Sequence, residues 1–264
     1  MSRQRKLQIV LEVLIILALL AFLVGQVYTE PERQAPMAVD FGTSGNKGVS
    51  FGSLAQTQGL TNMSVSFWMY YNAVRSGDYG DVVSQYDDAG HGWWIDLVDY
   101  VAPNANNLTF GINFSDTDGG WKLPTDTLTA GNRYHVTITY NRSATTNDPV
   151  FYINGAEVAE SEVSTPVGAA ATDVENLVFG YGGYGGAGNG TYVILSDVRI
   201  YNRILAAGEV AEIYNSRDIN AVPYGLVFQA TFLENGAYID RINGAVGTGA
   251  GSPAFVPDTI LNWH

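Results

Sequence analysis

The chain has 264 residues, a net charge of −13 and no cysteine. Such an acidic chain repels phosphate backbones, so we expect no nucleic-acid partner, and the lack of cysteine excludes disulfides, thiolate metal sites and cysteine nucleophiles. Hydrophobic residues make up 46% of the chain, and 30 glycines stand against only 13 lysines and arginines, which favours strands joined by tight turns around a well-packed core.

The first distinct segment, residues 7–28 (LQIVLEVLIILALLAFLVGQVY), is apolar apart from Glu12. At about 1.5 Å per residue, a helix of this length spans roughly 33 Å, enough to cross the hydrocarbon core of a bilayer. A secretory signal has a shorter apolar region and a small-residue cleavage site, which this exit sequence lacks. The basic tail, residues 1–6, is kept in the cytoplasm by the positive-inside bias. We predict a single-pass protein of the cell membrane with a periplasmic or extracellular main domain.

Glu12 is unusual inside such a helix, because a carboxylate at mid-depth costs about 2.5 to 3.5 kcal/mol. Either it reaches the cytoplasmic interface or is protonated, or it pairs with a polar group on a neighbouring helix of a membrane complex. A third reading comes from type IV pilins, which this segment resembles in carrying a Glu near the start of an N-terminal helix. The segment departs from them at Leu7, where a prepilin has Gly or Ala.

A polar, proline-bounded stalk, residues 29–37, follows and leads to one domain expected over residues 38–264. Two long runs alternate as half-buried strands do. In 63–71 (MSVSFWMYY), Val65, Phe67 and Met69 share one face. In 134–140 (YHVTITY), the even-numbered residues, Tyr, Val, Ile and Tyr, share one face. The odd-numbered residues, His135, Thr137 and Thr139, share the other.

Shorter strands are expected in the second half of the chain, including a hairpin at Asn154-Gly155, a strong two-residue turn signal. Residues 205–216 (LAAGEVAEIYNS) have helical spacing instead. The pattern predicts an all-β fold, a two-sheet antiparallel jelly-roll sandwich with one short helix, behind a single transmembrane α-helix. The shorter strands expected are 150–153, 157–160, 177–179, 192–195 and 197–201.

The order SVSFWMYY, NRYHVTITYN, VFYINGAEV and then LVFGYGGYGGAGNGTYVILSDVRIYNRILAAGEVAEIYN resembles the laminin-G-like jelly roll of the concanavalin A-like lectin/glucanase superfamily. The last block is the most specific, because strand, Gly-rich hairpin, Asp-Val-Arg-Ile-Tyr-Asn strand and short helix recur together there. AVDFGTSGNKGVSFGS, residues 38–53, resembles the early hairpin of that family. The resemblance covers about residues 38–216.

The C-terminal segment, residues 225–257, resembles the part that usually opens such modules, but here it comes last. It represents either a circular permutation or a second repeat truncated after its first strands. About 40 residues cannot form a second domain alone, so we expect them to join the one sandwich. Leu226, Phe228 and Ala230 would then face its core.

The resemblance also implies a calcium site, since relatives bind calcium through loop carboxylates and carbonyls. The candidates are Asp87 and Asp88 in QYDDAGHG and Asp116 and Asp118 in NFSDTDGGW, which with carbonyls would complete a shell of six to eight oxygens. Ordinary turn aspartates are the alternative.

Aromatic side chains could provide a surface for sugars or for protein partners, because exposed Trp and Tyr bury much apolar area. The candidates for such binding aromatics are Trp93, Trp94, Trp121, Tyr181 and Tyr184. Trp68 is expected to pack within or against the sheet.

The sequence does not indicate an enzyme. Retaining glucanases of the resembling superfamily present Glu-x-Asp-x-x-Glu along one strand, and no such spacing occurs here. His91, His135 and His264 show no metal-ligand spacing, and His135 is expected to be structural. There is no Gly-x-Ser-x-Gly elbow.

These features predict a non-catalytic, membrane-anchored interaction or scaffold subunit that docks its exported sandwich onto partner proteins of a membrane complex. One alternative is a calcium-assisted, lectin-like module that binds glycans. The other is a pilin-like filament subunit.

Overall fold

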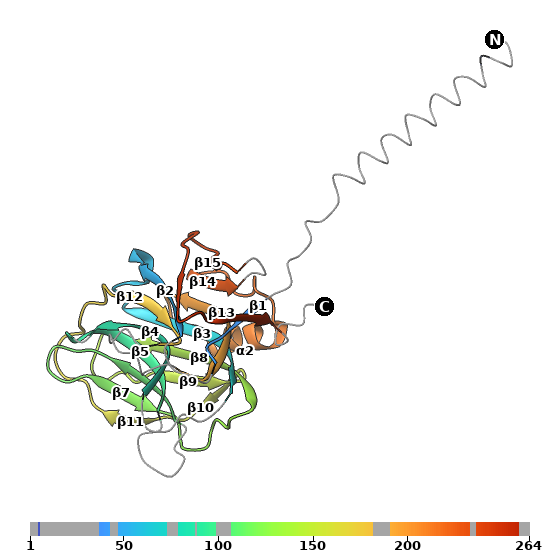
Figure 1. Ribbon diagram of the computed structural model, residues 1–264. Coiled ribbons are helices and arrows are strands. Elements are labelled where there is room, and N and C mark those ends of the chain that lie inside the picture. Colours follow the sequence, from blue (N-terminus) through green and yellow to red (C-terminus); the bar gives the residue numbers. More distant parts are fainter. Residues whose placement is uncertain are drawn as a thin grey trace. The chain divides into compact units, whose positions relative to one another are not determined.

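The computed structural model describes Arg5 and residues 37–42, 47–72, 79–87, 89–98, 107–181, 191–232 and 236–258. The chain divides into two units, Met1–Gln34 and Ala35–His264. The second unit, taken by itself, is an all-β sandwich of two antiparallel sheets with one α-helix (Figure 1). This confirms the fold class expected for residues 38–264, an all-β sandwich with one short helix.

Sheet A follows the order β10-β9-β8-β3-β13-β1-β14-β15, with β17 paired to β1 and β13 also paired to β14. Sheet B follows the order β11-β7-β6-β5-β4-β12-β2-β16. The strands of sheet A are β1 (Met37–Asp40), β3 (Asn62–Tyr71), β8 (Asn132–Asn141), β9 (Val150–Ile153), β10 (Ala156–Val158), β13 (Val193–Tyr201), β14 (Leu226–Phe232), β15 (Tyr238–Asp240) and β17 (Ala254–Pro257). Those of sheet B are β2 (Gly48–Ser53), β4 (Tyr79–Asp87), β5 (His91–Val98), β6 (Asn107–Ile112), β7 (Gly119–Lys122), β11 (Ser161–Ser164), β12 (Asn176–Phe179) and β16 (Thr248–Ala250).

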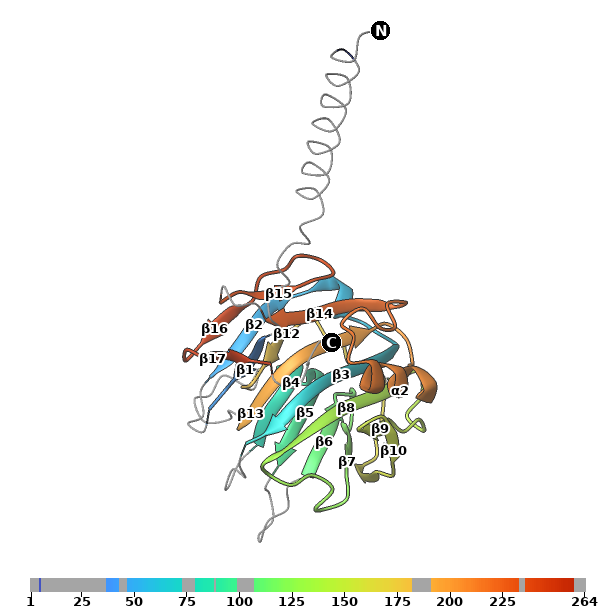
Figure 2. The ribbon, with the colours of Figure 1, turned by 90° about the vertical axis from the view of Figure 1, so that its right-hand side faces the viewer.

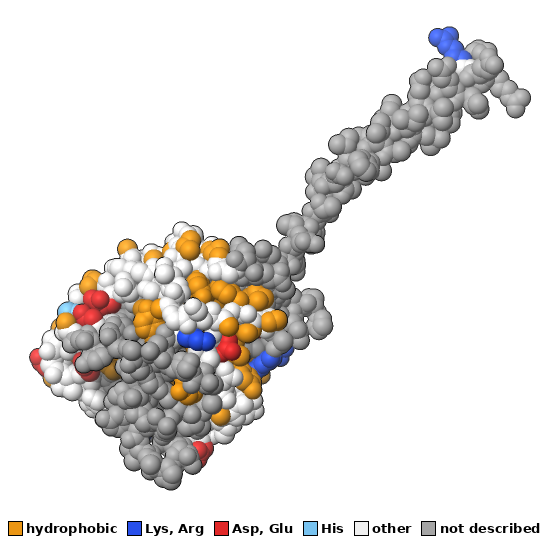
Figure 3. Space-filling model, viewed as in Figure 1, with side chains coloured by type: hydrophobic (Ala, Val, Ile, Leu, Met, Phe, Trp, Pro, Cys, Tyr) orange, Lys and Arg blue, Asp and Glu red, His pale blue; other side chains and the backbone are white. Residues whose placement is uncertain are grey.

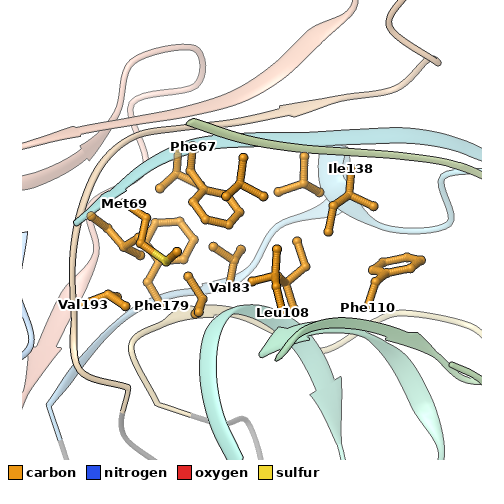
Figure 4. Close-up of a cluster of buried hydrophobic side chains, with 14 of the residues drawn as sticks. Phe67, Met69, Val83, Leu108, Phe110, Ile138, Phe179 and Val193 are labelled. Atoms are coloured by element: carbon orange, nitrogen blue, oxygen red, sulfur yellow. The ribbon is translucent and has the colours of Figure 1, made fainter. Parts of the chain in front are cut away.

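The main core lies between the two sheets, because each strand points alternate side chains inward. Figure 4 shows this core: Phe67, Met69, Ile138 and Val193 come from sheet A and meet four side chains of sheet B. The faces expected for residues 63–71 and 134–140 are confirmed, since the residues expected to face inward belong to this core, namely Val65, Phe67, Met69, Tyr134, Val136, Ile138 and Tyr140. The four labelled side chains from sheet B are Val83, Leu108, Phe110 and Phe179.

The C-terminal strands complete both sheets of the same sandwich. β14 lies beside β13 and β1 in sheet A, whereas β16 pairs with β2 in sheet B. Phe228 and Ala230 face the core as expected, but Leu226 packs against a second apolar cluster beneath the helix. The β13–β14 pairing shifts register between Ile200 and Tyr201, next to Leu226.

The early segment differs from the expected hairpin. β1 belongs to sheet A and β2 to sheet B, so the two strands do not pair with each other. Their connection instead crosses from one sheet to the other. The resemblance identified the right strands but not their pairing.

Helix α2 (Ala207–Ser216) covers the outer face of sheet A, and Figure 2 shows it beside β3 and β8. The helix begins at Ala207, two residues later than expected. Leu205 lies ahead of the helix, yet its side chain is buried with those of Val210 and Ile213. Tyr214 stacks on Trp68 with ring centroids 5.6 Å apart. This cover explains why the polar side of β3, as well as its apolar side, is buried. A short 3₁₀ turn, η1 (Ala55–Thr57), follows β2.

Two strands expected at 192–195 and 197–201 form one strand, β13, with an irregularity in its middle. The pairing to β3 shifts register between Ser196 and Arg199, and Asp197 has a positive φ of 47°. A bulge of this kind inserts an unpaired residue and re-aims its side chain. The hairpin at Asn154-Gly155 is confirmed, with both residues at positive φ between β9 and β10.

The expected membrane segment cannot be compared with the structure, because residues 7–28 lie outside the described residues. Among the residues that are described, no helix has the length and apolar character needed to span a membrane.

Candidate functional site

The outer face of sheet B is set by the alternation of β4, β5 and β6. Trp93, Ile95 and Leu97 of β5 point into the core, which leaves Trp94 and Asp96 on the opposite side. Trp94 pairs across the sheet with Ser84 of β4 on one side and with Gly111 of β6 on the other.

Tyr86 and Trp94 form an aromatic pair on this face. Their ring centroids lie 5.3 Å apart with an interplanar angle of 47°, and both side chains are half-buried. The indole lies directly against the backbone of β6, because a Cβ at Gly111 would come within 2.1 Å of its ring. A glycine is therefore required beneath the indole. The aromatic pair is a partly exposed, apolar platform fixed by the sheet.

A second group, the Asp–His–Glu cluster, lies where the β4–β5 hairpin turns and consists of Asp87, His91 and Glu175. Its ligand-type atoms all lie within 4.8 Å of one another. Nδ1 of His91 is 3.1 Å from both carboxylate oxygens of Asp87. In Figure 3 a histidine side chain lies beside acidic side chains at the surface of the molecule.

The backbone holds these three residues in place. Asp87 and His91 are cross-strand partners, and Oδ1 of Asp87 also accepts hydrogen bonds from the backbone N–H groups of Ala89 and His91, each at 3.0 Å. Glu175 directly precedes β12, which pairs with β4. Its carbonyl accepts a hydrogen bond from Nε2 of Gln85 at 3.0 Å.

The electrostatics of the cluster are those of a hydrogen-bonded Asp87–His91 pair with a second carboxylate, that of Glu175, beside it. The hydrogen bond from His91 lowers the pKa of Asp87, and the same contact raises the pKa of His91. Burial, followed by the negative charge of Asp87, raises the pKa of Glu175. Two carboxylate groups and one ring nitrogen are donors of the kind that bind divalent metal ions.

A buried acid pair, Asp81 and Asp96, lies further along the same strands. The two are cross-strand partners, and their side chains are 2% and 1% exposed. Burial, and then the charge of Asp81, raises the pKa of Asp96 well above its usual value. Oδ1 of Asp96 has no hydrogen-bond partner in the described part of the chain. This pair favours a protonated carboxyl rather than two charges.

The aromatic prediction needs two corrections. Trp93 and Trp121 are 1% and 0% exposed and belong to the core, so neither can present a binding surface. Their strand positions point inward, and Trp121 donates a hydrogen bond to Asp148 at 2.9 Å. Tyr181 is half-buried, with its ring so close to Gly48 that a Cβ there would lie 1.5 Å from it. Tyr184 lies outside the described residues.

The proposed calcium ligands are not brought together as one group. Asp116 and Asp118 lie in the turn before β7 and belong to no described group of three ligand-type side chains. Oδ1 of Asp118 instead accepts the backbone N–H of Phe114 at 3.1 Å, and Oδ1 of Asp116 lies 3.4 Å from the hydroxyl of Ser115. Asp88 is not among the described residues, and neither is Glu12. Of the three that the structure describes, only Asp87 lies in such a cluster.

The sequence interpretation missed His91 and Glu175. The signal for His91 was present, because the turn after Asp87 in QYDDAGHG places His91 directly across from it. Glu175 had no such signal, since only the pairing of β12 with β4 brings it to the hairpin. His135 is structural as expected: it is buried on the outer face of sheet A and packs against Trp68.

The described residues form a two-layer antiparallel jelly-roll sandwich with one α-helix packed on sheet A. The sequence profile described as the concanavalin A-like lectin/glucanases superfamily matches residues 43–211, more than half of the chain. The chain therefore belongs to this family. No curated protein matches it in sequence.

Two solved structures are similar in fold. One, from Bacteroides ovatus, is described as a candidate carbohydrate-binding protein; it has a TM-score of 0.57 and 16% identity, over 85% of this chain and 60% of its own. The other, a heptameric SAP-like pentraxin from Limulus polyphemus, has a TM-score of 0.50 and 16% identity, over 81% of this chain and 95% of its own. This chain thus spans only 60% of the first structure's length. Likeness at this identity concerns the fold.

Proposed function

We propose that this protein is a non-catalytic, glycan-binding module that binds through the outer face of sheet B. The observation that carries the proposal is the aromatic pair, Tyr86 and Trp94, held partly exposed over Gly111. A sugar ring has an apolar C–H face, and contact with a flat aromatic ring removes that face from water. Such a platform is fixed before the ligand arrives, which lowers the entropy cost of binding.

Polar groups at the end of the platform favour a hydroxyl-rich ligand. Asp87 directly follows Tyr86 at the end of β4 and lies with Glu175 at the turn of the β4–β5 hairpin, and carboxylates accept strong hydrogen bonds from hydroxyl groups. The chain carries a net charge of −13, which repels anionic polymers. We therefore infer that the ligand is a neutral polysaccharide rather than a sulfated or uronic-acid-rich one.

The family includes glucanases, but the acid pair on this face does not suit hydrolysis. A retaining glycosidase needs two carboxyl groups that flank the scissile bond about 5 to 5.5 Å apart and reach the substrate. Asp81 and Asp96 are almost completely buried, so neither reaches a bound sugar in this arrangement. This supports a binding role. The description of the Bacteroides ovatus structure agrees with it, although that likeness rests on fold alone.

We also propose that residues 7–28 anchor the module in the cell membrane, with residues 29–37 as a stalk and the sandwich outside the cytoplasm. The apolar run and the basic tail before it support this. Alkaline carbonate extraction of membranes should leave the full chain in the pellet. A mature chain that begins near residue 29 and is found free in the medium would contradict it. Two other roles stay predictions because both depend on Glu12. They are docking onto partner proteins of a membrane complex and assembly into a pilin-like filament.

Affinity electrophoresis of the full chain in detergent, through gels that contain individual neutral polysaccharides, tests the glycan proposal. We expect retardation by at least one of them, and Trp94→Ala should weaken it at least about tenfold, or about 1.4 kcal/mol. Tyr224→Ala is the matched control, because Tyr224 is an exposed aromatic, at 79%, that lies just before β14 of sheet A and away from the aromatic pair in the fold. Retardation that Trp94→Ala leaves unchanged, or binding only to acidic polysaccharides, would refute the proposal.

A further inference from the structure

We propose that Asp87, His91 and Glu175 form a binding site for a first-row transition metal ion, with Zn²⁺ as the best fit, rather than for calcium. The site would sit at the end of the β4–β5 hairpin. It does not depend on glycan binding, so each proposal can fail without the other.

The geometry suits a small metal ion. Zinc ligands lie about 2.0 to 2.2 Å from the metal, so two ligand atoms of one site are about 3.5 Å apart. His91 and Asp87 are already 3.1 Å apart, and no ligand atom of the three lies more than 4.8 Å from another. A small side-chain rotation of Glu175 would close the remaining distance.

The three ligands come from segments that are held independently of any metal. Asp87 ends β4, His91 begins β5, and Glu175 is tied to β4 by the hydrogen bond from Gln85 to its carbonyl. β12, which follows Glu175, pairs with β4 at Ser84 and Val83. A site built on paired strands needs little reorganisation when the ion binds.

The identity of the donors selects the metal. Calcium takes six to eight oxygen ligands, whereas an imidazole nitrogen with carboxylates is a donor set for zinc, iron, cobalt or nickel. The cluster offers one nitrogen and two carboxylates, and the side chains of His91 and Asp87 remain 39% and 28% exposed. A fourth position would therefore stay open to water or to an external ligand, as in zinc sites with three protein ligands.

The charges point the same way. Two carboxylates meet here, and the one side chain that can carry a positive charge beside them in the described structure is His91. A divalent cation would neutralise both carboxylates and take the imidazole as a neutral ligand.

Isothermal titration of the full chain in detergent, without a polyhistidine tag and after treatment with a chelator, tests the site. We expect one Zn²⁺ per chain, with His91→Ala and Glu175→Ala each weakening the affinity at least about tenfold. Millimolar Ca²⁺ should not displace the Zn²⁺. Asp116→Asn is the matched control, since Asp116 is an exposed loop aspartate outside the cluster.

Substitution with Co²⁺ gives a second readout, because visible absorption bands report nitrogen and oxygen coordination directly. His91→Ala should abolish these bands while circular dichroism of the variant shows an unchanged fold. Zn²⁺ affinity that is the same in wild type and both cluster variants would overturn the proposal. So would tight Ca²⁺ binding that Asp87→Asn removes and His91→Ala does not, because that result describes an oxygen-only calcium site.

Discussion

The outer faces of the two sheets carry similar polar residues but treat them in opposite ways. On sheet A, Nε2 of His135 lies 3.0 Å from the hydroxyl of Ser66, which also accepts a hydrogen bond from Thr137 at 3.0 Å. The carboxylate of Asp197 accepts hydrogen bonds from Arg199 and from Gln229. Helix α2 covers part of this face, and these polar groups have protein partners there, whereas Nδ1 of His135 and Nε1 of Trp68 have none in the described structure.

The outer face of sheet B has no such helix in the described structure, although it also holds buried polar groups. Asp96 is buried with an unpartnered oxygen, and at the hairpin end Asp87 is hydrogen-bonded to His91 with Glu175 beside them. Tyr86 and Trp94 stay partly exposed. Sheet A therefore uses buried hydrogen bonds to fix its own cover, whereas the described part of sheet B leaves Tyr86 and Trp94 partly exposed on its outer face.

The largest effect should come from Arg199→Met on sheet A. Arg199 is fully buried, and it binds Asp197 and the carbonyls of Asp218 and Ala221, so it ties the segment after α2 to the sheet. Its removal leaves Asp197 as an unpaired buried charge, which costs about 3 to 5 kcal/mol. Urea denaturation should show this loss in the free energy of unfolding.

A double variant separates the charge from the packing. Asp197→Asn added to Arg199→Met removes the unpaired carboxylate, and asparagine tolerates the positive φ at this bulge. The double variant should recover part of the lost stability. If Arg199→Met alone unfolds no more easily than wild type, the buried network does not hold the cover of sheet A.

His135→Gln should change how stability depends on pH. Burial, with a smaller contribution from the charge of Arg199, lowers the pKa of His135 to about 3. The folded protein therefore keeps the ring neutral, and its stabilising effect is complete above pH 6.5 and is lost as the pH falls toward 3. Between pH 6.5 and 5, wild type should lose about 2 kcal/mol that the glutamine variant keeps. Urea denaturation at both pH values measures the free energy of unfolding of each protein. A difference between wild type and His135→Gln that is the same at both pH values would contradict the prediction.

On sheet B, Asp96→Asn should change the pH dependence of stability in the opposite direction to His135→Gln. Because the pKa of Asp96 is raised in the folded state, the folded protein holds the proton more tightly than the unfolded chain. The stability linked to this group is therefore greatest below about pH 3.9 and falls as the pH rises through the folded pKa. At pH 8 the asparagine variant should be more stable than wild type by about 1 to 2 kcal/mol. The gain should shrink toward pH 4, and exposed Asp116→Asn should show no gain at either pH.

The sequence predicted the parts of the fold that depend on local pattern. The alternation in 63–71 and 134–140 identified their core faces, and Asn154-Gly155 identified its turn. The C-terminal strands were expected to join the same sandwich because they are too few to fold alone, and they do so in both sheets. These are properties of short segments and of chain length, which a sequence contains directly.

The candidate site was harder to predict because it depends on pairing between distant segments. In GWWI the two adjacent tryptophans must point to opposite sides, and only the neighbouring strands decide that Trp93 is the one inside. Glu175 reaches Asp87 through a strand pairing that no local pattern shows. The aspartates of the NFSDTDGGW turn fit a calcium loop by composition, yet Asp118 accepts a hydrogen bond from the backbone N–H of Phe114. Residue types were therefore a weaker guide than strand register.

The smallest effect, and the sharpest test of sheet B as a binding surface, should come from Gly111→Ala. The added methyl group would lie within 2.1 Å of the indole of Trp94, so the ring must tilt away from β6 and from its partner Tyr86. We expect a loss of about 1 kcal/mol in glycan affinity, or roughly fivefold in Kd, because the platform is disturbed while every ligand-contacting side chain is retained. Gly208→Ala on α2, where a Cβ meets open space, is the control and should bind as wild type does. Equal affinity of Gly111→Ala and wild type would mean that the orientation of Trp94 does not matter, and the aromatic pair would lose its role as the platform.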